Sequence, residues 1–179
     1  MDEASTVAEL GRRLGEVPPP EVPQHPYVAA WRAPTEDDID AVHALMAAAD
    51  TVDHPTWITP RDEVADTFDL PHIDHRRDSI IGVDAGGRVV ALGSAFLHPS
   101  RAGALTVTLG GCVHPEVRGR GIGTAVLAWQ RARGRQHIAE VLPSLDGTTA
   151  WTADLKVYAE ESNAPHRRIA EAAGMVPER

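Results

Sequence analysis

The residues best suited to chemistry form a short run rich in glycine and arginine. Residues 118–124 read Arg-Gly-Arg-Gly-Ile-Gly-Thr and lie between an apolar run ending at Val113 and a helical pattern that resumes at Ile122. Glycine lets the backbone turn sharply and approach a ligand, while free amides at a helix start and nearby arginines attract anions. The segment therefore predicts a loop that binds a pyrophosphate, with a tight turn bearing solvated arginines as the alternative.

Two other phosphate-binding loops rely on the same physics, and the spacing disfavours both. The loop of nucleotide hydrolases ends in Gly-Lys-Ser/Thr, which is missing here. Residues 119–123 lack the last glycine interval of a dinucleotide fingerprint, and the repeated strand–helix units of that fold are missing too. A nicotinamide oxidoreductase is therefore disfavoured.

The same loop resembles the coenzyme A signature of the GNAT N-acetyltransferases. The resemblance rests on Arg118-x-x-Gly121-x-Gly123, on the preceding residues 113–116 (Val-His-Pro-Glu), and on Asn163 with a helix that ends at Gly174-Met175. It covers residues 27–175. Residues 78–91 are further similar to the first half of tandem GNAT proteins.

The resemblance implies that acetyl-CoA is the co-substrate and that backbone amides hold most of it. One strand, residues 105–113, would splay from its neighbour so that its end holds the pantetheine arm, and the helix start would hold the pyrophosphate. The implied coenzyme-binding residues are Gly111, Cys112, Val113, Arg118, Gly119, Arg120, Gly121, Ile122, Gly123, Thr124 and Asn163.

Proton transfer is the part of the reaction for which the sequence offers least. An amine must lose a proton to attack, and the leaving thiolate must gain one. In similar enzymes the acid is a tyrosine four residues before the closing glycine, where this chain has Ala170. His114 and Tyr158 are the candidate catalytic residues, and each also has an ordinary structural interpretation. A coenzyme A-binding domain with little or no transfer activity is therefore the alternative function.

Other side chains predict no further chemistry. His72-Ile73-Asp74-His75 has no helical register and no additional ligands, so we predict a solvated loop and no metal site. The four tryptophans do not interleave with basic residues, which disfavours nucleic-acid binding. Cys112 is expected to be a small buried side chain rather than a nucleophile.

The elements that would position this site are those of an α+β fold with a mixed sheet, similar to the GNAT acyltransferase fold. Residues 1–26 are expected to be a helix (2–14) and a proline-rich linker, and residues 27–179 the acetyltransferase domain. Strands are expected at 27–32, 79–83, 88–97, 105–113 and 154–159. Helices are expected to begin near Thr35, Thr59, Ile122 and Asn163, the third ending near Gly134.

Composition limits the partners and the location. A net charge of −9 disfavours nucleic acid and favours a cationic acceptor, namely a small-molecule or peptide amine. One cysteine and no apolar run near about 20 residues indicate a cytoplasmic protein without a membrane partner. Only four residues follow Met175, so we expect a sheet short of its final strands, and either a homodimer or a piece of a longer tandem protein.

Overall fold

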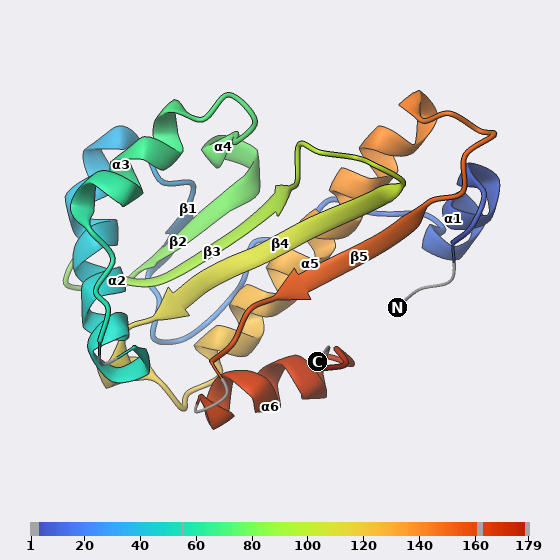
Figure 1. Cartoon of the computed structure of the whole chain (residues 1–179). Coiled ribbons are helices and arrows are strands. Elements are labelled where there is room, and N and C mark those ends of the chain that lie inside the picture. The colour runs from blue at the N-terminus through green and yellow to red at the C-terminus, as the bar shows by residue number, and fades with distance from the viewer. Residues whose placement is uncertain (1–3, 55, 161–162, 178–179) are drawn as a thin grey trace.

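The computed structural model describes residues 4–54, 56–160 and 163–177, and its centre is a five-stranded mixed sheet (Figure 1). The strands are β1 (Ala30–Arg32), β2 (Ser79–Val83), β3 (Val89–Leu97), β4 (Ala104–Val113) and β5 (Thr152–Val157). Their order in the sheet follows the chain; β1 to β4 are antiparallel and β5 pairs with β4 in parallel. The predicted α+β class with a mixed sheet is confirmed.

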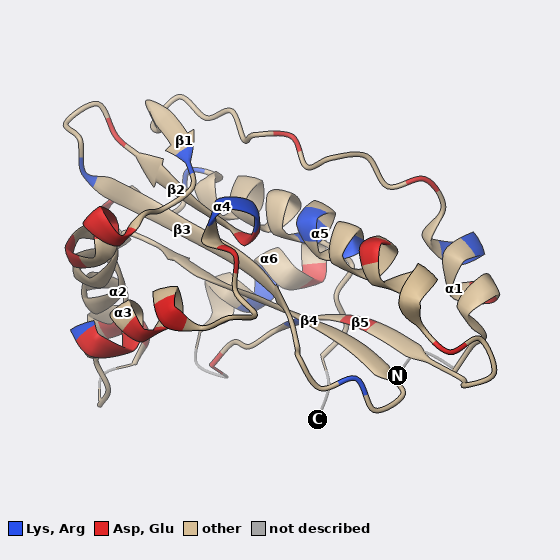
Figure 2. Ribbon diagram, turned by 90° about the horizontal axis from the view of Figure 1, so that it is seen from above, with Lys and Arg blue, Asp and Glu red and all other residues tan. Residues whose placement is uncertain are grey.

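Helices cover both faces of this sheet. The α-helices are α1 (Val7–Leu14), α2 (Ile39–Asp53), α3 (Arg61–Asp69), α4 (His75–Asp78), α5 (Ile122–Val141) and α6 (Ala164–Ala172), with 3-10 turns η1 (Glu36–Asp38), η2 (Pro115–Val117) and η3 (Leu142–Ser144). Seen from above, α2 and α3 lie on one side of the strands and α5 on the other (Figure 2). None of the described helices is long and apolar enough to cross a membrane.

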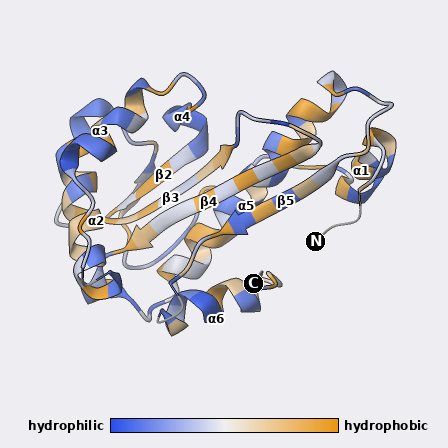
Figure 3. Ribbon diagram, in the orientation of Figure 1, coloured by the Kyte–Doolittle hydropathy of each residue, from blue (hydrophilic) through white to orange (hydrophobic). Residues whose placement is uncertain are grey.

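The two faces of β4 differ, and this difference separates core from site. Leu105, Val107 and Leu109 are buried against α5 and α1, and because side chains alternate along a strand, Thr106 and Thr108 face the other way. Figure 3 shows the apolar residues gathered on the sheet, whereas α3 and α6 are largely hydrophilic. The main core therefore lies on the α5 side, which leaves the α2 side for a ligand.

Helix α5 runs on to Val141, so the prediction that it ends near Gly134 is wrong. Gly134 is buried under the sheet, and a β-carbon there would lie 2.7 Å from Leu155 Cδ2. A glycine often stops a helix, but here it lets α5 pack closely on β5 and continue. β5 itself begins two residues earlier than predicted, at Thr152.

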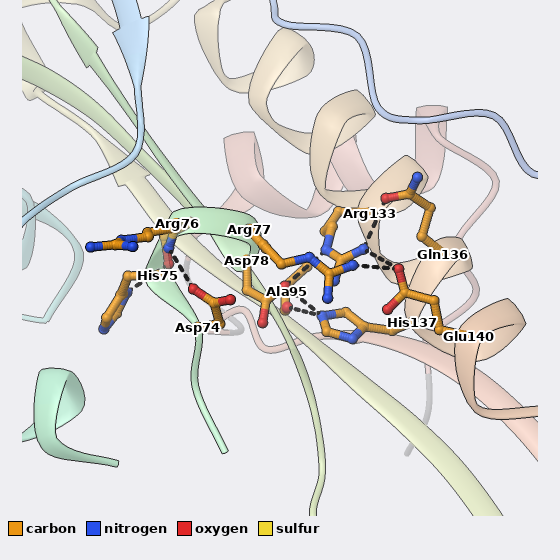
Figure 4. A network of polar contacts seen from close by, with 11 residues as sticks. Asp74, His75, Arg76, Arg77, Asp78, Ala95, Arg133, Gln136, His137 and Glu140 are labelled. Atoms are coloured by element: carbon orange, nitrogen blue, oxygen red, sulfur yellow. Dashed lines mark hydrogen bonds and ion pairs between the residues drawn. The ribbon is translucent and has the colours of Figure 1, made fainter. Parts of the chain in front are cut away.

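A buried ion-pair network joins the middle of α5 to the start of β2 (Figure 4). Arg133 Nε donates to Asp78 Oδ1 at 2.8 Å, and its Nη1 donates to Glu140 Oε1 at 3.1 Å. His137 Nε2 lies 3.0 Å from Asp78 Oδ1. Burial alone raises the pKa of Asp78, but the hydrogen bonds from His137 and Arg133 outweigh it, so the pKa is lowered and the carboxylate stays charged.

The N-terminal segment packs against the same core. Helix α1 begins at Val7, later than predicted, because Thr6 and Glu9 form a capping box. Leu10 is buried in the α5-side cluster, and Ser5 pairs with Trp151 just before β5. The division of the chain at residue 27 stays a prediction, and residues 2 and 3 of the expected helix lie outside the described residues.

Candidate active site

The first part of the site is a gap between β4 and β5. The two strands pair from Ala104 with Thr152 to Leu109 with Val157. Beyond that point β4 continues to Val113 paired with β3 only (Figure 1). On the other edge of β4, His114 N donates to Val90 O at 2.9 Å. Bonded and non-bonded pairs alternate along an antiparallel ladder, so the backbone groups of Gly111 and Val113 point away from β3 into this gap.

Gly111 is the residue that this local geometry requires. Its φ is 149°, and a β-carbon there would lie 2.1 Å from the carbonyl oxygen of Leu92. Any other residue would have to displace the β3 backbone. Cys112, in contrast, belongs to the bonded set, so its amide faces β3 and only its side chain faces the site.

The second part is the glycine loop that leads into α5. Gly119 and Gly121 have φ values of 74° and 91°, and Gly121 is the N-cap of the 20-residue helix. The first helical bond runs from Ala125 N to Gly121 O, which leaves the amides of residues 122–124 without an intrahelical acceptor. These amides and the helix dipole together favour a bound anion.

The two loop arginines differ in what they contact. Arg118 donates through Nη1 and Nη2 to the two carboxylate oxygens of Asp53 at 2.8 and 2.7 Å, and through Nε to Val113 O at 2.9 Å. The Arg120 guanidinium lies 4.3 Å from the centre of the Tyr27 ring. Arg118 therefore fastens the loop to the end of α2. Arg120 is the loop arginine whose positive charge can attract an anion.

The third part is a cavity of about 930 Å³ between the β3–β4 surface and helices α2 and α3. Its lining includes four carboxylates and three histidines, and no lysine or arginine among the described residues: Asp50, Asp53, Glu63, Glu160, His54, His75 and His166. Acidic residues are also concentrated on α2 and α3 (Figure 2). The cavity thus attracts a cation.

An aromatic wall lies at the end of the cavity near α3 and α4. The His75 ring stacks on Phe68 at 4.1 Å and meets Phe96 edge-on at 5.9 Å. His75 Nε2 donates to Thr67 O at 3.2 Å and its Nδ1 lies 2.9 Å from Ser79 Oγ. Burial lowers the pKa of His75, so this wall is uncharged near neutral pH and suits an apolar group.

This position of His75 corrects the sequence interpretation. Residues 72–75 were expected to form a solvated loop, whereas His75 begins α4 and faces the cavity. No cluster of three or more histidine, cysteine or acidic side chains that could hold a metal occurs in the described part of the chain.

The structure separates the two predicted catalytic residues. Tyr158 follows β5 and lines the cavity, with 72% of its surface exposed. His114 does not line it; its Nδ1 accepts from the amide of Glu116 at 3.4 Å. Asn163 lines the cavity and also caps α6, since its Oδ1 accepts from His166 N at 3.1 Å.

His166 is the site residue that sequence reasoning missed. It lines the cavity from α6 and is half-buried. Burial lowers the pKa of His166. The negative charge of Asp53 raises this pKa, and the positive charge of Arg118 lowers it further. Its position three residues after Asn163 and four before Ala170, on one face of a helix, was the signal available in the sequence.

A model of the acetyltransferase (GNAT) domain family matches residues 31–176. The chain belongs to the GNAT acetyltransferase family. No protein of curated function is similar enough in sequence to be counted as a relative.

Solved GNAT structures share the fold at low sequence identity. The yncA protein of Salmonella typhimurium, solved with acetyl-CoA, has a TM-score of 0.60 and 16% identity over 84% of this chain and 80% of that one. Diaminobutyrate acetyltransferase of Paenibacillus lautus was solved with its substrate and coenzyme A. It has a TM-score of 0.56 and 19% identity, and the match covers 80% of this chain and 73% of that one. A GNAT protein from Sphaerobacter thermophilus has a TM-score of 0.58 and 24% identity to this chain. The match covers 80% of this chain but only 42% of that longer protein.

GNAT proteins use acetyl-CoA, and the residues of this chain fit it. The open edge suits an extended arm with amide groups, because that arm can pair with the backbone of Gly111 and with the amide of Val113, whose carbonyl already accepts from Arg118. The start of α5 suits a pyrophosphate. Gly111 belongs both to this edge and to the cavity, so the coenzyme edge and the cavity meet there.

Proposed function

We propose that this protein transfers the acetyl group of acetyl-CoA directly to a primary amine that carries an apolar or aromatic body. The observation that supports the proposal is that the anion-binding helix start and the open edge of β4 lead at Gly111 into a cavity lined by carboxylates. The carboxylates attract the protonated amine, and the Phe68–His75–Phe96 wall accepts its body.

Backbone groups would perform most of the binding. The amides of residues 122–124 hold the pyrophosphate, and those of Gly111 and Val113 hold the arm and polarise the thioester carbonyl. The side chain of Arg118 is bonded to Asp53, so it shapes the loop and does not bind the phosphate itself. Asn163 lies where it can contact the arm from α6.

The binding-only alternative rests on Ala170. This residue sits in α6 at the place where the resemblance leads one to expect a tyrosine acid. A domain without that acid could retain coenzyme A binding and lose transfer. The two functions differ in whether bound acetyl-CoA turns over.

Calorimetry with acetyl-CoA and a free-thiol assay test the proposal together. The amines offered are phenethylamine, spermidine and L-2,4-diaminobutyric acid, which differ in charge and in apolar surface. We expect micromolar binding, at least about 8 kcal/mol, and thiol release fastest with phenethylamine. Binding without release for all three amines supports the alternative, and no binding of acetyl-CoA contradicts the function as a whole.

Direct transfer also predicts that Cys112 takes no part as a nucleophile. Burial raises the pKa of its thiol from 9.0 to about 12. At pH 8 this lowers the thiolate population by about a thousandfold, and alkylation proceeds through the thiolate. We expect iodoacetamide to modify the folded protein about a thousandfold more slowly than the urea-unfolded protein, and Cys112→Ser to keep its turnover. Equal alkylation rates would contradict the raised pKa of Cys112, and an inactive serine variant that still binds acetyl-CoA would contradict direct transfer.

A further inference from the structure

Helix α6 presents an unassigned imidazole to the acceptor cavity. Asn163 and His166 both line the cavity, and Ala170 follows one turn later. Residues four apart lie on the same face of a helix, so His166 shares its face with Ala170. A group able to carry a proton is thus present one turn from the place where the expected tyrosine is missing.

The surroundings of His166 keep the imidazole neutral yet close to charged groups. It is half-buried, with Asp53 of α2 and Arg118 of the loop as the charged groups that act on it. Both of those side chains are held by their mutual ion pair. On the segment before α6, Glu160 Oε1 lies 3.4 Å from Nδ1 of a different histidine, His54.

The other histidines in or near the cavity, and Tyr158, are less suitable. His75 uses both ring nitrogens, with Thr67 and Ser79. His54 is near Glu160. Tyr158 is largely exposed, and His114 does not line the cavity. Among the described residues of the cavity, His166 is left as the half-buried ring without a side-chain partner of its own.

We propose that His166 is the catalytic residue that carries the proton of acetyl transfer, an inference that rests on the proposed function. The neutral imidazole accepts a proton from the attacking nitrogen as the C–N bond forms at the thioester carbonyl carbon. The C–S bond breaks with its electron pair remaining on sulfur, and the imidazolium gives the same proton to that sulfur. The products are the N-acetyl amine and the coenzyme A thiol, with the imidazole again neutral.

The pH profile of the reaction follows from the pKa of this ring. Burial lowers the pKa of His166 below the ordinary value of 6.5, so the neutral form already predominates near pH 7. The neutral fraction grows as pH rises, and kcat/KM should therefore increase through an inflection on the acidic side of pH 6.5. The amine adds its own, more alkaline, dependence. Removal of His166 should erase the acidic inflection of kcat/KM and leave the alkaline dependence of the amine unchanged.

The test compares His166→Ala and His166→Gln with the parent, using the three amines named above. His72→Ala is the matched control, because His72 is exposed and does not line the cavity. We expect kcat to fall about a hundredfold to ten-thousandfold in both His166 variants. We expect the Kd for acetyl-CoA to stay within about threefold and added imidazole to restore part of the rate in His166→Ala.

Each outcome decides between the two proposals. A His166→Ala rate within about threefold of the parent, or an unchanged acidic inflection, overturns the role of His166 and leaves the enzyme intact. If the His166 variants lose both the rate and acetyl-CoA binding, His166 has a structural role, and the proposed catalytic role is overturned. If the parent protein binds acetyl-CoA but releases no thiol, both the role of His166 and acetyl transfer are overturned. If the parent does not bind acetyl-CoA, the proposed function as a whole is overturned.

Discussion

Gly121→Val is expected to weaken acetyl-CoA binding by about a hundredfold or more, because two charge-assisted hydrogen bonds lost at the pyrophosphate amount to about 3 kcal/mol. Gly121 is the N-cap of α5 and has a φ of 91°. The nearest atom to a β-carbon there is His25 Nε2 at 3.7 Å, so the β-carbon itself fits. The two methyl groups beyond it would occupy the space in front of the free amides and keep the phosphate away from them.

The control for this variant must carry the same backbone strain. Gly103→Val does so, since Gly103 has a φ of 77° and lies in the turn before β4, at the end opposite the loop. Both variants should lose about 1–3 kcal/mol of stability, and only Gly121→Val should lose binding by calorimetry. A folded Gly121→Val protein that binds acetyl-CoA as tightly as the parent would show that the site is assigned to the wrong loop.

Arg133→Ala is expected to lower the free energy of unfolding by about 3–5 kcal/mol, since it leaves the buried carboxylate of Asp78 without its arginine partner. Arg133 and Asp78 are 2% and 4% exposed. The matched control is Arg131→Ala on the same helix, where the side chain is exposed and a change within about 0.5 kcal/mol is expected. Urea titrations of the three proteins measure both differences.

The same variant has a defined dependence on pH. In the parent the pKa of Asp78 is lowered, so the stabilisation is present above the ordinary value of 3.8 and is lost as pH falls through the lowered pKa. Without Arg133, only His137 still opposes the effect of burial on that pKa, so the carboxylate takes up a proton more readily in acid. The difference between parent and variant should therefore be largest near neutral pH and shrink toward pH 4. A difference that is constant with pH would mean that lost packing, not charge, causes the effect.

The features that local sequence specifies were predicted well. The glycine loop at residues 118–124 does lie between a strand and a helix start, and strands do lie close to the expected 79–83 and 88–97, joined by a turn at 84–88. Asn163 does cap the last helix. In each case the backbone conformation follows from the residue types at the turn or cap itself, so neighbours alone carry the information.

The features that were missed depend on residues far apart in the chain. Gly134 resembles a helix stop until β5 is packed against it. The ion pair of Arg118 with Asp53, 65 positions earlier, is a contact that the loop's own sequence does not predict. The spacing of His166 from Asn163 and Ala170 places it on one face of α6, but the charged groups around it come from α2 and the loop. Tertiary contacts therefore complete all three environments, and spacing along the chain gives at most part of them.

The ion pair between Arg118 and Asp53 spans two ligand sites. Arg118 begins the coenzyme loop, and Asp53 lines the acceptor cavity at the end of α2. A loop that shifts when the coenzyme enters pulls on α2 through this pair, and an ammonium beside Asp53 competes with Arg118 for its charge. Equilibrium coupling of this kind is reciprocal. If the proposed function holds, the factor by which the amine changes the affinity for the coenzyme equals the factor by which the coenzyme changes the affinity for the amine.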